Sequence, residues 1–329
     1  MNRRVLAIDG GGSKTDVVLV DTSGRLLAQV QGPSSQPQTY GVPNALRVLD
    51  ELVEQIRIAA RLPAGEPLAD HAAVYLSGMD LPQEILAIEP ALRARGWAET
   101  MIVDNDTFAV LRAGTQVLDA VAVVCGTGIN CVARNAAGQQ SRFAALGEVT
   151  GDWGGGHHLG QRALWHAVRA DDGRGPGTTL QTSIASHFNR SDALSVGIAI
   201  HLGEIGNHRL SDLAPVVLAA AAAGDEIAGR LVDRLAEEIA LLATVSMRRL
   251  ELLDRPVDLV LGGGLARSRD TRLFDRLTQR MMEVNPATSL VIVDSAPVVG
   301  AVLLGLDVLG APVDVAERVS DLLTAVAGR

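Results

Sequence analysis

The chain begins the same succession of elements twice, and this repetition restricts the possible folds more than any other feature. An apolar, β-rich run is followed by a glycine turn, a second run, a short turn and a third run, first over residues 4–30 and again over residues 120–145. The repeat does not have a short period, which argues against a solenoid. The sequence therefore predicts an α/β protein with two lobes of related topology.

The remaining elements follow from hydrophobic periodicity and from turn residues. In the first half we expect strands at 4–9, 16–20, 26–30, 71–77 and 101–103, a loop at 32–41, and helices at 44–61 and 83–95. In the second half we expect strands at 120–124, 129–134, 139–145, 257–261 and 290–293, a long helix near 225–250, and closing helices from residue 297 onward.

Three glycine turns, at residues 9–15, 125–130 and 262–265, are candidate phosphate-binding segments. Glycine lets backbone N–H groups approach an anion closely, and consecutive N–H groups form an anion-binding concavity. None of the turns has the spacing of a dinucleotide fingerprint or the ending of a P-loop. Taken together, the turns predict that two hairpins hold the phosphates of one nucleotide and that the third turn lies against its base.

Acidic residues follow two of the predicted strands. Asp9 would face the phosphates, which a carboxylate can do only with a divalent cation between, so we assign Asp9 to Mg²⁺, held through water. Asp104, Asn105 and Asp106 lie between a strand and a helix, and one of them is expected to cap that helix. Transfer of a phosphoryl group to an alcohol needs a carboxylate that accepts the hydroxyl proton. Asp106 is the candidate base, with Asn105 orienting the hydroxyl.

Composition limits the kinds of molecule that the chain is expected to bind. The formal net charge is −9, which disfavours binding to nucleic acid or to an anionic membrane. Hydrophobic residues make up 47% of the chain, but no uninterrupted apolar run is long enough for a membrane span. Two cysteines indicate neither a disulfide scaffold nor a zinc site. With no signal peptide recognisable at the start, we expect a cytoplasmic protein.

The motifs, quoted together, resemble those of the actin/hexokinase/Hsp70 superfamily of ATPases. Residues 9–15 and 123–130 are similar to its two phosphate motifs, and residues 259–268 to its adenosine motif. Residues 105–114 and 296–304 resemble its two connecting helices. Within the superfamily, the segments Asp-Gly-Gly-Gly-Ser-Lys-Thr, Asn-Asp, Cys-Gly-Thr-Gly-Ile-Asn and Gly-Asp-Trp-Gly-Gly-Gly resemble the N-acetylglucosamine kinase-like branch of the BadF/BadG/BcrA/BcrD ATPase family.

The resemblance implies a fold and an activity. The fold would be two ribonuclease H-like α/β lobes of the actin/hexokinase/Hsp70 type with an interlobe cleft. Residues 1–117, completed by helices in 297–329, would form the first lobe, and residues 118–296, with helical insertions, the second. The implied activity is an ATP- and Mg²⁺-dependent transfer to the 6-hydroxyl of a small-molecule amino sugar by a homodimer.

The resemblance, together with the turns, assigns residues to the two ligands. Asp106 would be the base, and Gly263 and Gly264 would lie under the adenine. The nucleotide contacts are assigned to Gly11, Gly12, Ser13, Lys14, Thr15, Gly126, Thr127, Gly128, Gly263, Gly264 and Arg267. The sugar contacts are assigned to Ser35, Gln36, Asn105, Asp106, Asn130, Gly147 and Asp152.

Two departures from the family pattern lie where the sugar would be recognised. Trp153 replaces a glutamate that commonly follows the loop aspartate, and Gln36 replaces an asparagine. N-acetylglucosamine is therefore the leading acceptor, while glucosamine, N-acetylmuramic acid or another hexose derivative stays open. An ATPase activator or a sugar-binding protein without kinase activity is the alternative function. Trp153 could stack on a sugar or pack into its own loop, and His157 and His158 could line the pocket or begin a helix.

Overall fold

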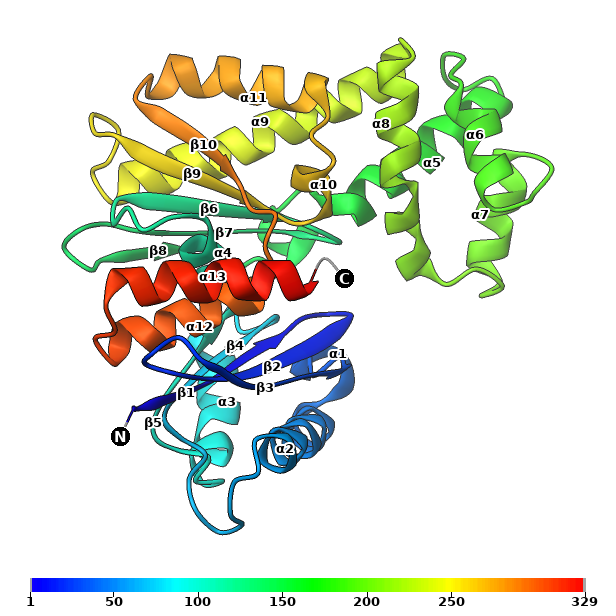
Figure 1. Cartoon of the computed structure of the whole chain (residues 1–329). Helices are drawn as coiled ribbons and strands as arrows, with labels where there is room; N and C mark the ends of the chain where they lie inside the picture. Colours follow the sequence, from blue (N-terminus) through cyan, green and yellow to red (C-terminus); the bar gives the residue numbers. More distant parts are fainter. Residues whose placement is uncertain (1, 328–329) are drawn as a thin grey trace. The chain divides into compact units, whose positions relative to one another are not determined.

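The computed structural model describes residues 2–327, and within them the chain divides into two compact units (Figure 1). Unit 1 comprises the residues up to Gln116 together with those from Val293 onward, and unit 2 comprises residues Val117–Ile292. Each unit contains one five-stranded mixed sheet, and the two sheets have the same topology, so the α/β prediction of two related lobes is confirmed.

The sheet of unit 1 has the strand order β3-β2-β1-β4-β5. Its strands are β1 (Arg4–Gly10), β2 (Lys14–Asp21), β3 (Leu26–Pro33), β4 (Ala69–Leu76) and β5 (Ala98–Asn105). The first three strands form an antiparallel meander, whereas β4 and β5 run parallel to β1. The ends of β1, β4 and β5 therefore meet at one edge, which is where open α/β sheets bind ligands.

Helices cover both faces of this sheet. They are α1 (Pro37–Tyr40), α2 (Val42–Ala59), α3 (Pro82–Arg93), α4 (Asp106–Gly114), α12 (Pro297–Val308) and α13 (Val313–Ala327). Helix α2 buries an apolar stripe, and a Cβ on Gly32 of β3 would approach its Leu52 Cδ2 to 2.6 Å. On the other face, a Cβ on Gly305 of α12 would lie 2.3 Å from Val5 Cγ1 of β1. Glycine at both positions thus lets helix and sheet pack closely.

The sheet of unit 2 has the order β10-β9-β6-β7-β8, which repeats the pattern of unit 1. Its strands are β6 (Ala120–Cys125), β7 (Ile129–Arg134), β8 (Gln140–Arg142), β9 (Val257–Gly262) and β10 (Thr288–Ile292). Its helices are η1 (Gly147–Thr150), α5 (Gly155–Asp171), α6 (Leu180–His187), α7 (Ala193–His201), η2 (Asn207–Leu213), α8 (Ala214–Ala222), α9 (Glu226–Arg249), α10 (Gly264–Arg267) and α11 (Thr271–Val284).

Helix α9 organises the core of unit 2. It begins at the cap residue Asp225, whose carboxylate accepts a hydrogen bond of 2.9 Å from Ala228 N. Its apolar stripe packs against β6, β7 and helices α8 and α11. The prediction of one long helix near 225–250 is confirmed. This helix could be predicted because a capping aspartate and sustained periodicity are strong local signals.

Two local predictions are wrong. The third strand of the second copy, expected over 139–145, ends at Arg142, and Ala145 has a left-handed φ of 50°, which no strand continues through. The expected loop at 32–41 contains the short helix α1, which has proline at its start and ends at Gly41. A single helical turn is too short to produce a periodic signal.

Candidate active site

The first glycine turn of unit 1 is held by a neighbouring loop. Gly11 N donates to Lys14 O at 2.9 Å and closes the β1–β2 hairpin. The Ser34 hydroxyl donates to Gly11 O at 2.9 Å. A Cβ on Gly12 would lie 3.5 Å from Gln36 Oε1, which also accepts a hydrogen bond from Thr39 Oγ1. The structure thus brings the predicted phosphate turn and the predicted sugar loop together, with Gly12, Ser13 and Lys14 exposed.

Two residues assigned to ligands have side chains that face inward. Thr15 and Ser35 are both fully buried, and the Thr15 hydroxyl donates to Ser35 Oγ at 2.9 Å. A Cβ on Gly10 would approach the same Ser35 Oγ to 2.6 Å. These two side chains therefore pack beneath the turn inside the protein. Only the backbone groups of Thr15 and Ser35 are left to contact a ligand.

Asp9 is a buried carboxylate without a hydrogen bond. Its side chain is only 6% exposed, and no hydrogen bond to it occurs within residues 2–327. Burial raises its pKa well above the ordinary value, and the charges of Asp106 and Asp16 add to that rise, while Lys14 opposes it. Among residues 2–327 this carboxylate forms no ion pair and has more negative than positive neighbours, which is the electrostatic condition that a bound divalent cation satisfies.

The donor set fits a magnesium ion only in part. The described residues include no group of three or more His, Cys, Asp and Glu side chains that could hold a metal ion. Magnesium usually keeps several waters and is bound by one or two carboxylates together with substrate phosphates. Asp9 fits the role of such a single protein contact, with phosphate and water oxygens completing the shell.

Asp106 lies at the first position of α4, where the chain leaves β5. Burial raises the pKa of its carboxyl group to about 6, although hydrogen bonds from Thr107 and from its own backbone N–H partly oppose the rise. The side chain retains some exposure. A carboxylate with a pKa near neutrality can take up a proton from a hydroxyl and release it again.

Asn105 caps α4. Its Oδ1 accepts from Thr107 N at 2.9 Å, and its Nδ2 donates to Asp80 Oδ1 at 2.8 Å. The backbone of Asp80 is fixed in turn by Glu84 Oε2 at 2.9 Å. Asn105 is 2% exposed, so its amide orients the start of α4. Asp80 escaped the sequence interpretation because only its place after β4, in a turn containing Gly78, marks it.

In unit 2 the second and third glycine turns pack on each other. Gly263 has a φ of +89°, and a Cβ there would lie 2.3 Å from Cys125 O and 2.9 Å from Gly126 N. By contrast, Cβ atoms on Gly126, Gly128 and Gly264 would meet no heavy atom within 4 Å. At these three positions the fold itself leaves room for a side chain, so the open space is available to a ligand that approaches the backbone. Arg267 ends α10 and is exposed beside them.

The start of α5 is bound to the second turn. Gly156 N donates to Gly126 O at 2.8 Å and His157 N donates to Thr127 O at 2.9 Å. Gly155, with a φ of +78°, leaves no space for a Cβ, which would lie 2.4 Å from Gly128 O. The first amides of α5 are therefore used to hold the turn, and the sequence interpretation missed this role of the Gly154–Gly155–Gly156 run.

The predicted sugar residues of unit 2 lie around η1. Asp152 N donates to Gly147 O at 3.1 Å, and Asp152 Oδ2 accepts from Thr150 Oγ1 at 2.6 Å. Asn130 lies on β7, where its Oδ1 accepts from Cys131 N at 2.7 Å. Gly147 and Asp152 thus form one folded loop, with Asn130 on the strand that follows the second turn.

Trp153 packs into its own loop. It is 5% exposed, and the guanidinium of Arg234 lies 4.2 Å from its ring centroid. The next helix, α5, places His158 at 6.3 Å, stacked on the same ring. The buried indole thus has two protein groups beside its ring, which favours packing over sugar stacking. Cys125 and Cys131 are buried, and burial raises the pKa of each thiol to about 12.

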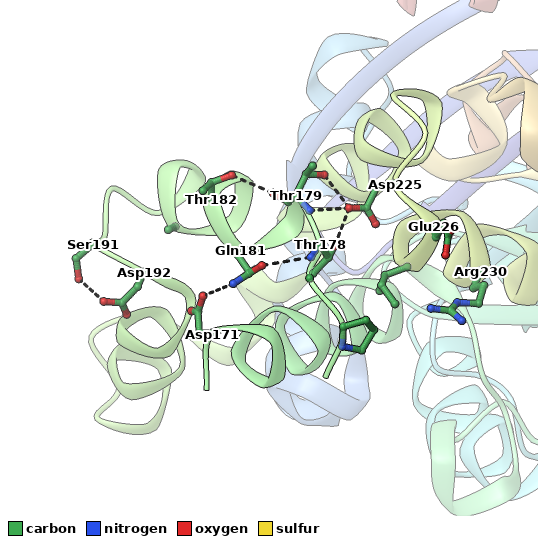
Figure 2. A pocket seen from close by; sticks show the side chains of 14 residues that line it. Asp171, Thr178, Thr179, Gln181, Thr182, Ser191, Asp192, Asp225, Glu226 and Arg230 are labelled. Atoms are coloured by element: carbon green, nitrogen blue, oxygen red, sulfur yellow. Dashed lines mark hydrogen bonds between the residues drawn. The ribbon is translucent and has the colours of Figure 1, made fainter. Parts of the chain in front are cut away.

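A hollow of about 630 Å³ opens among the helices of unit 2 (Figure 2), and no residue of the three glycine turns lines it. Several of its polar side chains are hydrogen-bonded to one another. Asp225 accepts hydrogen bonds from Thr178 and Thr179 while it caps α9. Asp171 Oδ1 accepts from Gln181 Nε2 at 2.7 Å. These carboxylates hold the helical insertion together.

Comparisons with known proteins find similarity over most of the chain. The model of the BadF/BadG/BcrA/BcrD ATPase family matches residues 6–305. An N-acetylmuramic acid/N-acetylglucosamine kinase from Clostridium acetobutylicum is 26% identical over 302 residues, covering 91% of this chain and 97% of that protein. An N-acetyl-D-glucosamine kinase from Dictyostelium discoideum is 27% identical over 312 residues, covering 92% and 97%.

A solved structure from Chromobacterium violaceum, described as that of a proposed N-acetylglucosamine kinase, is also similar. It superposes with a TM-score of 0.71 at 26% identity, covering 92% of this chain and 99% of that chain.

Within the described residues, no helix combines the length and the apolar content that crossing a membrane requires.

Proposed function

The chain belongs to the BadF/BadG/BcrA/BcrD ATPase family, and from this premise we propose that it is an ATP-dependent kinase that phosphorylates the 6-hydroxyl of an amino sugar. The observation that carries the proposal is the carboxyl group of Asp106, whose pKa burial raises to about 6 at the ligand-binding edge of a sheet. Relatives named as kinases for N-acetylglucosamine, or for it and N-acetylmuramic acid, support an amino-sugar acceptor.

In this reaction Asp106 accepts the proton of the attacking hydroxyl. General-base catalysis of this kind contributes roughly 10²–10⁴-fold to the rate. Asn105 holds the first turn of α4, and with it the Asp106 carboxylate, in a fixed orientation. Ser13, Lys14 and the backbone of the first turn bind phosphate, while Gln36, Asn130, Gly147 and Asp152 bind the sugar.

The nucleotide lies against the open glycines of unit 2. Gly126, Thr127 and Gly128 bind phosphate through their backbone, and the adenine rests on Gly263 and Gly264 with Arg267 beside it. The space at Gly126, Gly128 and Gly264 supports this assignment. Asp9 binds Mg²⁺, which neutralises phosphate charge when bound. Convergence of the two units on one nucleotide is part of the proposal, as are a homodimer and a cytoplasmic location.

The proposal is tested by a coupled ADP-release screen with glucosamine, N-acetylglucosamine, N-acetylmannosamine, N-acetylmuramic acid and glucose, each with and without Mg²⁺. We expect N-acetylglucosamine to stimulate ADP release most strongly and only when Mg²⁺ is present. Preference for N-acetylmuramic acid would move the acceptor to that sugar. If no sugar stimulates release above the ATPase background, the kinase proposal fails and the ATPase-activator alternative takes its place. Light scattering of the same sample measures the number of subunits.

The raised pKa of Asp106 predicts how activity depends on pH. A base must be ionised to accept a proton, so kcat/KM is expected to fall as the pH drops through about 6 and to level off above it. The fall should approach tenfold per pH unit on the acidic side. Measurement of kcat/KM for the sugar between pH 5 and 8, at saturating Mg·ATP, checks this. A rate that stays constant down to pH 5 would exclude a base with the raised pKa of Asp106.

A further inference from the structure

Strand β2 carries a second buried carboxylate that none of the roles above uses. Asp16 lies directly opposite Asp9 of β1 in the antiparallel register, and opposite Gln31 of β3 on its other side. Residues directly opposite one another project from the same face of a sheet. The three side chains therefore form one polar row at the edge where the first glycine turn begins.

Both oxygens of Asp16 have defined neighbours. Oδ1 accepts a hydrogen bond of 2.7 Å from Gln31 Nε2. Oδ2 has no hydrogen-bond partner of its own among residues 2–327, but the ammonium of Lys14 lies 2.8 Å from it. The two side chains differ in exposure, since Asp16 is 4% exposed and Lys14 is 50% exposed. One end of the ion pair is thus fixed inside the sheet and the other faces outward.

Lys14 is the only lysine of the chain. An ammonium carries three donors, so an ion pair with one carboxylate oxygen leaves donors directed toward solvent. A lysine side chain without a partner samples many rotamers, and ordering it on binding costs conformational entropy. Asp16 removes that cost in advance, because it holds the ammonium beside the turn before a ligand arrives.

We propose that Asp16 is a positioning residue for ATP, and that its buried carboxylate holds the Lys14 ammonium at the rim of the first turn, where the ammonium binds the terminal phosphates. This inference rests on the proposed function and names a residue that acts through Lys14 rather than on the substrate. Gln31 completes the arrangement by fixing the second carboxylate oxygen from β3.

A double-mutant cycle tests the coupling. Asp16→Asn and Lys14→Ala are each expected to raise the KM for ATP roughly 10-fold or more, as expected for loss of a charged hydrogen bond, with the KM for the sugar changed by less than about threefold. Because Asp16 acts through Lys14, the double variant should be no worse than Lys14→Ala alone. Lys14→Arg should recover part of the loss. Additive effects, or an unchanged KM for ATP in Lys14→Ala, would overturn the inference.

The single lysine also allows a test that needs no turnover. Biosynthetic incorporation of ¹³C-labelled lysine labels Lys14 alone, so Lys14 gives one set of side-chain NMR signals and keeps all three donors of its ammonium. In the native protein these signals should differ from those in Asp16→Asn, and addition of Mg·ADP should shift them. Asp314→Asn, which breaks an exposed 2.8 Å ion pair with Arg318 on α13, is the matched control and should leave the signals unchanged.

The two tests separate the inference from the function it rests on. If no sugar is phosphorylated but the Lys14 signal responds to Asp16→Asn and to Mg·ADP, the kinase proposal fails and the positioning role stands. If sugars are phosphorylated and the signal ignores both changes, the kinase stands and the positioning role is wrong. Lys14→Ala changes only an exposed side chain, so it remains informative even if Asp16→Asn does not fold.

Discussion

Replacement of Asp106 by asparagine is expected to lower kcat by about 10²-fold or more, because the amide cannot accept the hydroxyl proton. The change keeps the size of the side chain and its place at the start of α4, so the fold should persist. The KM for ATP should change by less than about threefold, since the base contacts the acceptor and not the nucleotide. Steady-state kinetics with the best acceptor of the sugar screen measure both constants.

The control for this variant is Asp307→Asn. Asp307 of α12 pairs with Arg112 near the other end of α4, with 2.7 Å between Oδ2 and Nε. Its loss perturbs the anchoring of the same helix without removing a base, so stability should fall while kcat stays within about twofold. If Asp106→Asn keeps kcat within a factor of a few, or if the two variants lose activity equally, Asp106 is not the base.

Alanine at two adjacent glycines should have very different effects on stability. Gly263→Ala places a Cβ 2.3 Å from Cys125 O at a φ of +89°, so overpacking and backbone strain together should cost about 1–3 kcal/mol of stability. Gly264→Ala meets no neighbour within 4 Å, so stability should change by less than about 0.5 kcal/mol. Denaturant unfolding of both variants measures the difference.

The same pair separates nucleotide binding from stability. With the adenine against Gly264, the methyl group of Gly264→Ala enters the space proposed for the nucleotide, and the KM for ATP should rise about tenfold while the fold stays intact. Gly263→Ala should weaken ATP binding as well, but only together with a loss of stability. A stable Gly264→Ala protein with a native KM for ATP would exclude the nucleotide from this glycine.

The positions of most strands along the chain and the related topology of the two units could be predicted, because local signals in the sequence agree with the fold. The glycine turns mark where strands end, and the repeated opening reveals that the two sheets share one topology. The end of β8 at Arg142 could not be predicted, since the residue types of 143–145 do not reveal that the chain leaves the sheet and that Ala145 becomes left-handed. Membership of the BadF/BadG/BcrA/BcrD ATPase family, expected from the motifs, is confirmed.

The site could be predicted by residue type but not by environment. The sequence places Asp106 at the end of a strand, whereas its pKa of about 6 depends on burial that only the packed unit provides. Thr15 and Ser35 are far apart in sequence, so neither the hydrogen bond between them nor their burial could be predicted from it. Trp153 likewise meets Arg234, which comes from the distant helix α9. These contacts are tertiary, and no local pattern encodes them.

The discontinuity of unit 1 has a consequence for synthesis. Helix α12 covers β1 and packs so tightly on α4 that a Cβ on Gly300 would lie 1.7 Å from Ala109 O, yet it is translated after the whole of unit 2. On the ribosome, the part of the first sheet that α12 covers therefore stays exposed while the residues of unit 2 are synthesised. Nascent chains stalled before α12 should bind chaperones or aggregate, and a stop codon there should leave no stable first unit.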